Sequence, residues 1–179
     1  MTCTYSILTK LLNGLLLSLL LISCGEPPTQ KQKTNPSELE ETLIEVNKNL
    51  VQSENRNIEA YIKRYGWEMK ETGTGLRYMI YKHGNGEKAM TGKIANLDYK
   101  VGLLDGTICY SSEEFGPKIF RIGKGGVESG LEEGILFLRV GDHVKFILPS
   151  HLAFGLVGDS RKIPARATLV YDIELIELK

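Results

Sequence analysis

The C-terminal end of the chain alternates apolar and polar residues with a period of two. Four apolar residues of this stretch share one face of an extended chain: Leu169, Tyr171, Ile173 and Leu175. Alternation of this kind is typical of a strand that buries one face and exposes the other. The stretch from Ala95 to Val101 has the same pattern. We therefore expect two long strands in an antiparallel sheet.

Shorter apolar runs, separated by glycine-containing turns, predict further strands. They lie near residues 76–81, 120–123 and 144–148. Asp105-Gly106 tolerates the positive φ of a tight hairpin and predicts a turn between two strands. Apolar residues at helical spacing predict one helix over Val127 to Leu138. Strands around a single helix predict an α+β domain, an antiparallel β-sheet wrapped around one short central helix.

A second set of apolar positions precedes the strands and has helical spacing. Its members are Leu39, Leu43, Val46, Leu50, Ile58 and Ile62. We expect a helix from Ser37 to Tyr65, broken within the polar stretch 53–57. Gly66 can take the left-handed conformation that closes a helix. Such a helix can pack against the domain or pair with a second copy of the chain. We favour packing, and therefore a monomer over a dimer.

The net charge and the placement of histidines and cysteines limit which partners and cofactors we expect. The chain has 22 basic and 22 acidic residues, so its net charge is zero and nucleic acid is not an expected partner. Its three histidines and three cysteines lack the spacing of metal ligands. We therefore expect neither a metal nor another cofactor. Within the domain Cys109 is the one cysteine, and we expect it to be a small buried residue without a disulfide.

The first residues predict a leader peptide. The apolar run 11–22, about twelve residues, is too short to span a bilayer and has the length of a signal-peptide core. It ends at Ser23-Cys24, which resembles the lipobox of bacterial lipoproteins, where this cysteine is lipidated after cleavage. The alternative is an ordinary secretory signal. The lipoprotein interpretation places the domain at the bacterial cell envelope, lipid-anchored on the periplasmic side of the inner or outer membrane.

Composition and periodicity together divide the chain into four parts. We expect a signal peptide at 1–23, a flexible tether at 24–36, a helical extension at 37–72 and a folded domain at 73–179. The tether is polar and contains prolines, without apolar periodicity. The last part is long enough to build one hydrophobic core.

Several motifs of residues 73–179 together resemble FKBP-type peptidyl-prolyl cis-trans isomerases. They are Asp105-Gly106-Thr107 with Ser111-Ser112, Gly130-Leu131-Glu132-Glu133-Gly134, Ala153-Phe154-Gly155, Ile163-Pro164 and the run Ala167 to Asp172. The helix leading into Trp67, with the Thr-Gly-Thr-Gly-Leu-Arg-Tyr run after it, resembles the Bacteroidetes lipoprotein branch of this family. That branch includes gliding-motility-associated isomerases. The resemblance implies the same α+β fold.

The resemblance also implies an isomerase that assists the folding of extracytoplasmic proteins, with proline-containing proteins as its clients. Its pocket holds a proline ring between apolar walls and needs no cofactor. The motifs carry over three residues as catalytic: Tyr99, Tyr110 and Phe154. They carry over six as substrate-binding: Cys109, Phe120, Val127, Leu131, Ile163 and Tyr171.

The chain departs from the family pattern at polar positions of this pocket. The usual aspartate is replaced by Tyr110, after Cys109, and the lid tyrosine is replaced by Phe154, which cannot donate a hydrogen bond. Lys118, Glu128 and Lys162 stand where the family has apolar residues. These changes predict the loss of two polar groups, a thinner apolar rim and modest catalysis. The alternative function is a catalytically weak chaperone or a binding module for an envelope protein.

Overall fold

The computed structural model describes residues 36–179. The predicted signal peptide, the predicted lipidation site at Cys24 and the predicted tether up to residue 35 lie outside the described residues. The chain divides into two units, Met1–Thr42 and Leu43–Lys179. The second unit contains the sheet. The boundaries predicted at residues 37 and 73 stay predictions.

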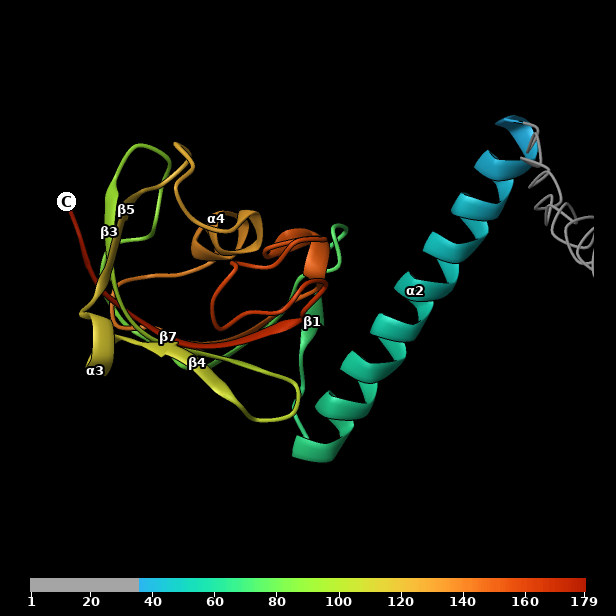
Figure 1. Ribbon diagram of the computed structural model, residues 1–179. Helices are drawn as coiled ribbons and strands as arrows, with labels where there is room; N and C mark the ends of the chain where they lie inside the picture. Colours follow the sequence, from blue (N-terminus) through green and yellow to red (C-terminus); the bar gives the residue numbers. More distant parts are fainter. Residues whose placement is uncertain (1–35) are drawn as a thin grey trace, which may run out of the picture. The chain divides into compact units, whose positions relative to one another are not determined.

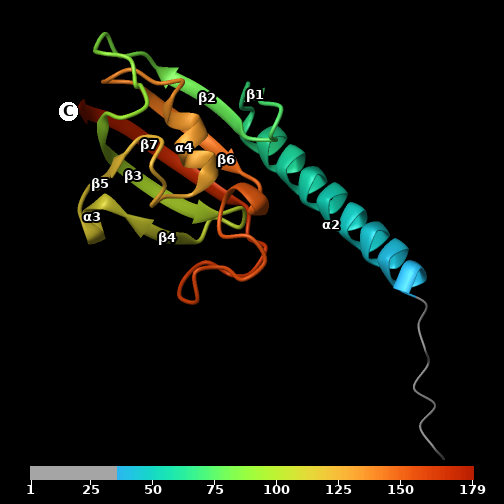
Figure 2. The same ribbon diagram turned by 90° about the horizontal axis from the view of Figure 1, so that it is seen from above.

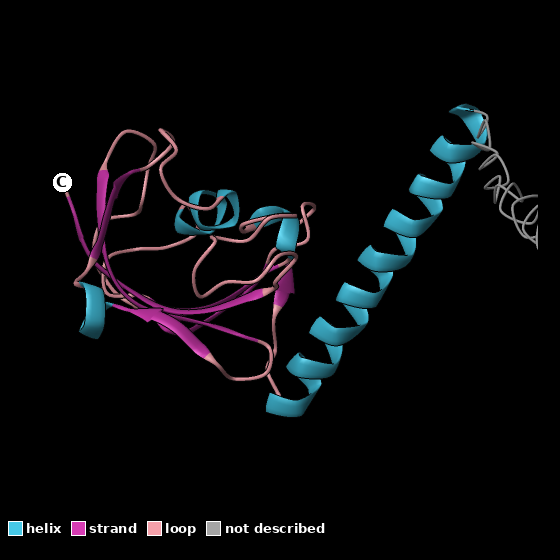
Figure 3. Ribbon diagram, in the orientation of Figure 1, coloured by secondary structure: helices cyan, strands magenta, loops and turns pink. Residues whose placement is uncertain are grey.

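Seven antiparallel strands form one sheet. They are β1 (Lys70–Glu71), β2 (Arg77–Lys82), β3 (Ile94–Leu103), β4 (Ile108–Ser111), β5 (Lys118–Arg121), β6 (His143–Leu148) and β7 (Leu169–Leu178). Their order is β1-β2-β6-β7-β3-β4, and β5 also pairs with β3. Figure 2 shows β6, β7 and β3 side by side in the middle of the sheet. Two short helical segments accompany the strands: α3 (Ser112–Phe115) and the 3₁₀-helix η2 (Ser150–Leu152) (Figure 3).

One short helix, α4 (Ser129–Ile135), lies over the concave face of the sheet (Figure 1). Two glycines allow it to approach β6 closely. A Cβ atom at Gly134 would lie 2.7 Å from Cζ of Phe146, and one at Gly130 would lie 2.6 Å from Cγ of Leu148. Because a larger residue at either position would collide with the sheet, these glycines set the distance between helix and strand.

The helix is shorter than the predicted span from Val127 to Leu138, which is wrong at both ends. Glu128 has extended backbone angles, φ −59° and ψ 140°, so the helix begins only after it. At the other end the N–H of Leu138 bonds to the carbonyl of Ile135, three residues back, which tightens the chain into a turn. The predicted helix was too long because the turn that follows α4 also contains a buried apolar residue, Leu138, at helical spacing.

The hydrophobic core lies between α4 and the sheet. The alternation predicted for β7 is confirmed, because its odd-numbered apolar residues are all buried: Leu169, Tyr171, Ile173 and Leu175. Leu131 and Ile135 are the buried residues of α4 that meet them in the same core cluster. Each such side chain contributes about 1.5–3 kcal/mol of transfer free energy on burial. The core therefore fixes the sheet and helix that support the loops around them.

The N-terminal helix α2 runs without interruption over Pro36–Tyr65. The break predicted within 53–57 is wrong, since the helix continues through these residues, and one of the polar residues there is a bonding partner of the domain. Glu54 Oε1 accepts hydrogen bonds from the N–H of Ser150 and the hydroxyl of Thr168, both at 2.7 Å. Glu54, which lies in the polar stretch where we predicted a helix break, therefore attaches the helix to the domain.

The two halves of α2 differ in their packing. In the second half, Ile58 and Tyr61 are buried against Ile147 of β6, and the predicted packing is confirmed there. Gly66, with φ 64°, closes the helix as predicted. In the first half of the helix several apolar side chains are exposed: Leu43, Ile44, Val46, Leu50 and Val51. The dimerisation alternative depends on these exposed residues.

Candidate functional site

A cavity of about 370 Å³ opens where the start of α4 meets the sheet. Its lining comes from β3, β4, β5, β7, the residue before α4 and the loop after η2. The lining residues are Tyr99, Val101, Tyr110, Lys118, Glu128, Phe154, Asp159, Arg161 and Tyr171. The fold thus brings six distant segments of the chain to one concave site, which is where ligand sites are usually found.

The predicted pocket residues fall into two groups. Four of them line the cavity: Tyr99, Tyr110, Phe154 and Tyr171. The other five do not line it and instead belong to the hydrophobic core or pack against it: Cys109, Phe120, Val127, Leu131 and Ile163. Their predicted contact with substrate, like the catalytic role of the first group, stays a prediction.

Two tyrosines form neutral aromatic walls. Tyr171 is buried, and burial, followed by the charge and the hydrogen bond of Glu128, raises its pKa well above the ordinary value. Burial, followed by the charges of Glu128 and Glu114, also raises the pKa of Tyr99. Both phenols therefore stay protonated at physiological pH, and the rings present apolar faces to the cavity.

A carboxylate enters the cavity from a position that the sequence did not indicate. The hydroxyl of Tyr110 donates to Asp159 Oδ2. Oδ1 of the same carboxylate accepts the N–H groups of Arg161 and Ile163, both at 2.8 Å. Tyr110 stands where the family has an aspartate, and its hydroxyl turns to Asp159 on the loop after η2. The cavity therefore still contains a carboxylate, supplied by the loop after η2.

We expect this loop to be stabilised less at low pH. Burial alone would raise the pKa of Asp159, but hydrogen bonds from Tyr110 and from the N–H groups of Ile163 and Arg161 hold it below the ordinary 3.8. The carboxylate therefore stabilises the folded state above pH 3.8, and this stabilisation is lost as the pH falls through the lowered pKa. The difference in urea unfolding between the wild type and Asp159→Asn should be largest at pH 6 and should shrink as the pH falls below 3.8. A difference that does not shrink with the pH would contradict this.

Of the three charged residues that the sequence placed at the rim, Lys162 pairs with Glu114 and does not line the cavity. The other two, Lys118 and Glu128, form a pair inside the cavity. Glu128 is only 8% exposed. Its Oε1 accepts the hydroxyl of Tyr171 at 2.7 Å, and its Oε2 lies 3.4 Å from Nζ of Lys118. The sequence interpretation, that these residues only thin an apolar rim, missed this. Their spacing in the chain carries no signal of pairing, since the contact depends on how β5 meets the start of α4.

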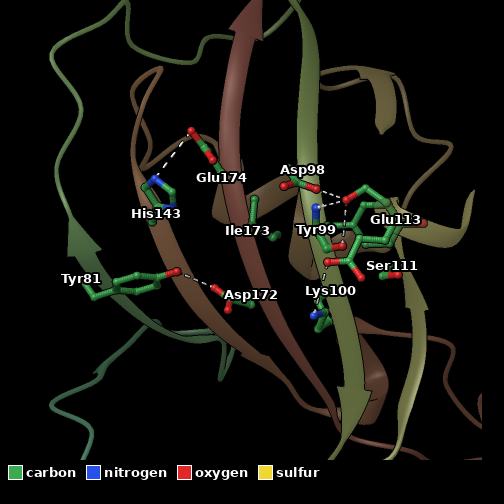
Figure 4. A pocket seen from close by; sticks show the side chains of 11 residues that line it. Tyr81, Asp98, Tyr99, Lys100, Ser111, Glu113, His143, Asp172, Ile173 and Glu174 are labelled. Atoms are coloured by element: carbon green, nitrogen blue, oxygen red, sulfur yellow. Dashed lines mark hydrogen bonds and ion pairs between the residues drawn. The ribbon is translucent and has the colours of Figure 1, made fainter. Parts of the chain in front are cut away.

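A second cluster of a tyrosine, a carboxylate and a lysine lies on the outer face of the sheet, away from α4. Tyr81 donates to Asp172 Oδ1 at 2.7 Å, and Lys145 Nζ lies 2.5 Å from Oδ2. Tyr81 and Asp172 border a depression of about 200 Å³ in which Nε2 of His143 lies 3.6 Å from Oε1 of Glu174 (Figure 4). Charged and polar side chains dominate this depression. It therefore lacks the apolar walls that would hold a proline ring.

Other chemistry is not apparent in the part of the chain that the structure describes. Cys109 is buried, and burial, with the charge of Asp159, raises the pKa of its thiol, which therefore stays protonated at neutral pH. Within residues 36–179 no group of three His, Cys, Asp or Glu side chains could hold a metal ion. Among the described helices, none combines the length and apolar character needed to cross a bilayer.

Comparison with known proteins identifies a family and agrees with the fold. The family described as FKBP-type peptidyl-prolyl cis-trans isomerase matches residues 85–176. FkpA of Aeromonas hydrophila is 36% identical over 142 residues, which cover 77% of this chain and 51% of that protein. Peptidyl-prolyl cis-trans isomerase FKBP15-1 of Arabidopsis thaliana is 37% identical over 118 residues, covering 65% of this chain and 75% of that protein.

Solved structures have the same fold. The crystal structure of FkpA from Escherichia coli matches with a TM-score of 0.63 and 28% identity, over 96% of this chain and 81% of that chain. This likeness confirms the predicted α+β fold. The chain spans about half the length of the curated FkpA proteins that it matches, 44% of the one from Neisseria meningitidis and 51% of the one from Aeromonas hydrophila.

Proposed function

Because this chain belongs to the FKBP-type peptidyl-prolyl cis-trans isomerase family, we propose that it catalyses the rotation of Xaa-Pro peptide bonds in protein clients. One observation carries this proposal. The cavity of about 370 Å³ has aromatic side chains from separate segments in its walls, Tyr99, Phe154 and Tyr171. A proline ring is apolar, and such walls exclude water from it.

The chemistry requires little more than this. Rotation of a peptide bond is slow because twisting removes amide resonance, with a barrier of about 18–20 kcal/mol. The twisted amide is less polar than the planar one, so an apolar site that excludes water favours it relative to the planar ground state. Lowering the barrier by about 4 kcal/mol already speeds rotation about a thousandfold. No nucleophile or general base takes part.

We expect Tyr99→Ala and Phe154→Ala each to lower kcat/KM about tenfold, because each removes one aromatic wall and lets water in. The measurement uses residues 24–179 and a protein whose refolding is limited by proline isomerisation, with an Ala-Ala-Pro-Phe peptide as a second substrate. Tyr65→Ala is the control, since it removes an exposed ring at the end of α2. A folded wild type that accelerates neither reaction overturns the proposal.

A second candidate function is supported by exposed apolar side chains on loops beside the cavity. Leu156 and Val157, on the loop after η2, are 71% and 79% exposed, and Phe115 at the end of α3 is 56% exposed. Such a surface suits a chaperone or binding module that holds unfolded segments. The same preparations decide between the two. Suppression of client aggregation that persists in Tyr99→Ala, without any acceleration of refolding, favours the second candidate.

We extend the first proposal to the place of action and to the clients. The apolar run 11–22 followed by Ser23-Cys24 supports a lipid anchor on Cys24 and a position at the periplasmic side of the bacterial envelope. Relatives named FkpA are bacterial proteins, which agrees with this setting. Proline-containing envelope proteins would then be the clients. A role in gliding motility stays a prediction from the sequence.

A further inference from the structure

Lys118 places an ammonium group in the cavity. Its Nζ lies 5.3 Å from the centroid of the Tyr99 ring and 5.7 Å from that of the Tyr171 ring, the two aromatic walls. Two partners hold it there, Glu128 Oε2 at 3.4 Å and the hydroxyl oxygen of Tyr171 at 3.5 Å. The side chain is 23% exposed, so the ammonium is partly desolvated yet open to whatever occupies the cavity.

The ammonium has a hydrogen-bond donor to spare. A lysine ammonium carries three N–H groups. Glu128 and Tyr171 take two of them. The third is left for a ligand, and its charge makes it a stronger donor than a neutral group.

A peptide segment that enters this cavity needs such a donor. Its carbonyl oxygens lose water on entry, and an unpaired buried acceptor costs free energy. The hydroxyl of Tyr110 already donates to Asp159, and Phe154 has no donor. Arg161 lines the cavity, but its side chain is exposed and has no hydrogen-bond or ion-pair partner within the described residues. Because Lys118 is already held in place, it loses less freedom than Arg161 on binding.

The chemistry of amide rotation also limits which backbone carbonyl of the peptide Lys118 can usefully bind. Twisting withdraws negative charge from the oxygen of the turning amide, so a donor to that oxygen would favour the planar form. A donor to a neighbouring amide, which stays planar, binds the ground state and the transition state equally and lowers KM. We propose that Lys118 Nζ donates to a backbone carbonyl adjacent to, but not part of, the turning Xaa-Pro bond. This inference rests on the proposed function and adds a substrate-binding residue to it.

The outer face of the sheet supplies a matched control. Lys145 is 24% exposed, pairs with Asp172, and has Nζ 5.4 Å from the Tyr81 ring centroid and 5.8 Å from that of Trp67. Its surroundings thus copy those of Lys118, but it does not line the cavity. Lys145→Met therefore reports what the loss of a paired lysine does to the fold, without touching the site.

Steady-state kinetics on the Ala-Ala-Pro-Phe peptide tests the proposal. We expect Lys118→Met to raise KM about tenfold and to change kcat less than about twofold, because one charge-assisted hydrogen bond is lost equally from both states. Lys118→Arg retains the donors and should restore KM to within about threefold of the wild type. Lys145→Met should leave both constants within about twofold. An unchanged KM in Lys118→Met, or a fall in kcat alone, overturns the proposal.

A second measurement does not depend on turnover. The ¹⁵N resonance of each lysine Nζ can be followed while the peptide is added. We expect the Lys118 signal to shift on saturation and the Lys145 signal to stay. A shift at Lys118 without any acceleration supports peptide binding at Lys118 while the proposed catalysis fails. Acceleration without a shift at Lys118 supports the proposed function and overturns the inference, and a protein that neither binds nor accelerates overturns both.

Discussion

Replacing Gly84 by alanine is expected to lower the free energy of unfolding by about 3 kcal/mol. A Cβ atom at this position would lie 2.2 Å from the carbonyl oxygen of Val140 and 2.4 Å from the carbonyl carbon of Gly141. Both are backbone atoms, so no side-chain rotation can relieve the overlap. The N–H of Gly84 also donates to the buried carboxylate of Asp142 at 2.7 Å, and this bond must shift with the loop.

The matched control is Gly73→Ala. Gly73 also lacks a positive φ, and a Cβ atom there meets nothing within 4 Å. The same chemical change should therefore leave stability within about 0.5 kcal/mol of the wild type, or raise it slightly by restricting the unfolded chain. Equilibrium unfolding in urea measures both variants. Equal effects at the two glycines would contradict the expected collision.

Glu54→Ala should destabilise the protein by a similar amount, about 3 kcal/mol, and release the second half of α2 from the domain. Its carboxylate accepts the N–H of Ser150 at 2.7 Å, the Ser150 hydroxyl at 3.1 Å and the Thr168 hydroxyl at 2.7 Å. Ser150 and Thr168 are both buried, and each buried donor left without an acceptor costs about 1–3 kcal/mol. Because Ser150 begins η2, the loop that carries Phe154 loses a support as well.

The effect has a regional signature. Amide hydrogen exchange should speed up in residues 54–65 of the variant more than in β3 and β7, because the attachment of the helix is lost while the core stays packed. Glu45→Ala is the control, since Glu45 is an exposed residue of the same helix without a hydrogen-bond or ion-pair partner within the described residues. Uniformly faster exchange, or an equal effect in the control, would show that Glu54 does not attach the helix.

The sequence predicted the elements whose pattern reflects burial. Alternation revealed β3 and β7 because each has one face in the core, and Asp105-Gly106 marked the hairpin because Gly106, with φ 94°, adopts the required conformation. The prediction failed where a polar side chain has a distant partner. Glu54 attaches α2 to the domain, and no local pattern shows that Ser150 and Thr168 meet it.

The same distinction applies to the residues of the candidate site. The aromatic walls at Tyr99 and Tyr171 could be located because the motifs fix their places on strands. The polar groups could not, because each is defined by a contact across the fold, Asp159 with Tyr110 and Lys118 with Glu128. The sequence interpretation considered each substituted position separately and therefore predicted only lost polar groups. In the structure, polar groups on other segments lie in the same cavity. A carboxylate or an ammonium can reach one point in space from several strands and loops.

The edges of the sheet have a consequence for the proposed action on protein clients. An extended client can add itself as a further strand to any long, unpaired edge, and such pairing leads to co-aggregation. Here one edge is formed by β1, which has two residues, the charged and exposed Lys70 and Glu71, and by the short part of β2 beyond it. The other edge is divided between β4 and β5, which have four residues each and pair with different parts of β3, and β4 turns directly into α3. Neither offers a template of useful length, so a polypeptide can visit the cavity and leave without being captured by backbone pairing.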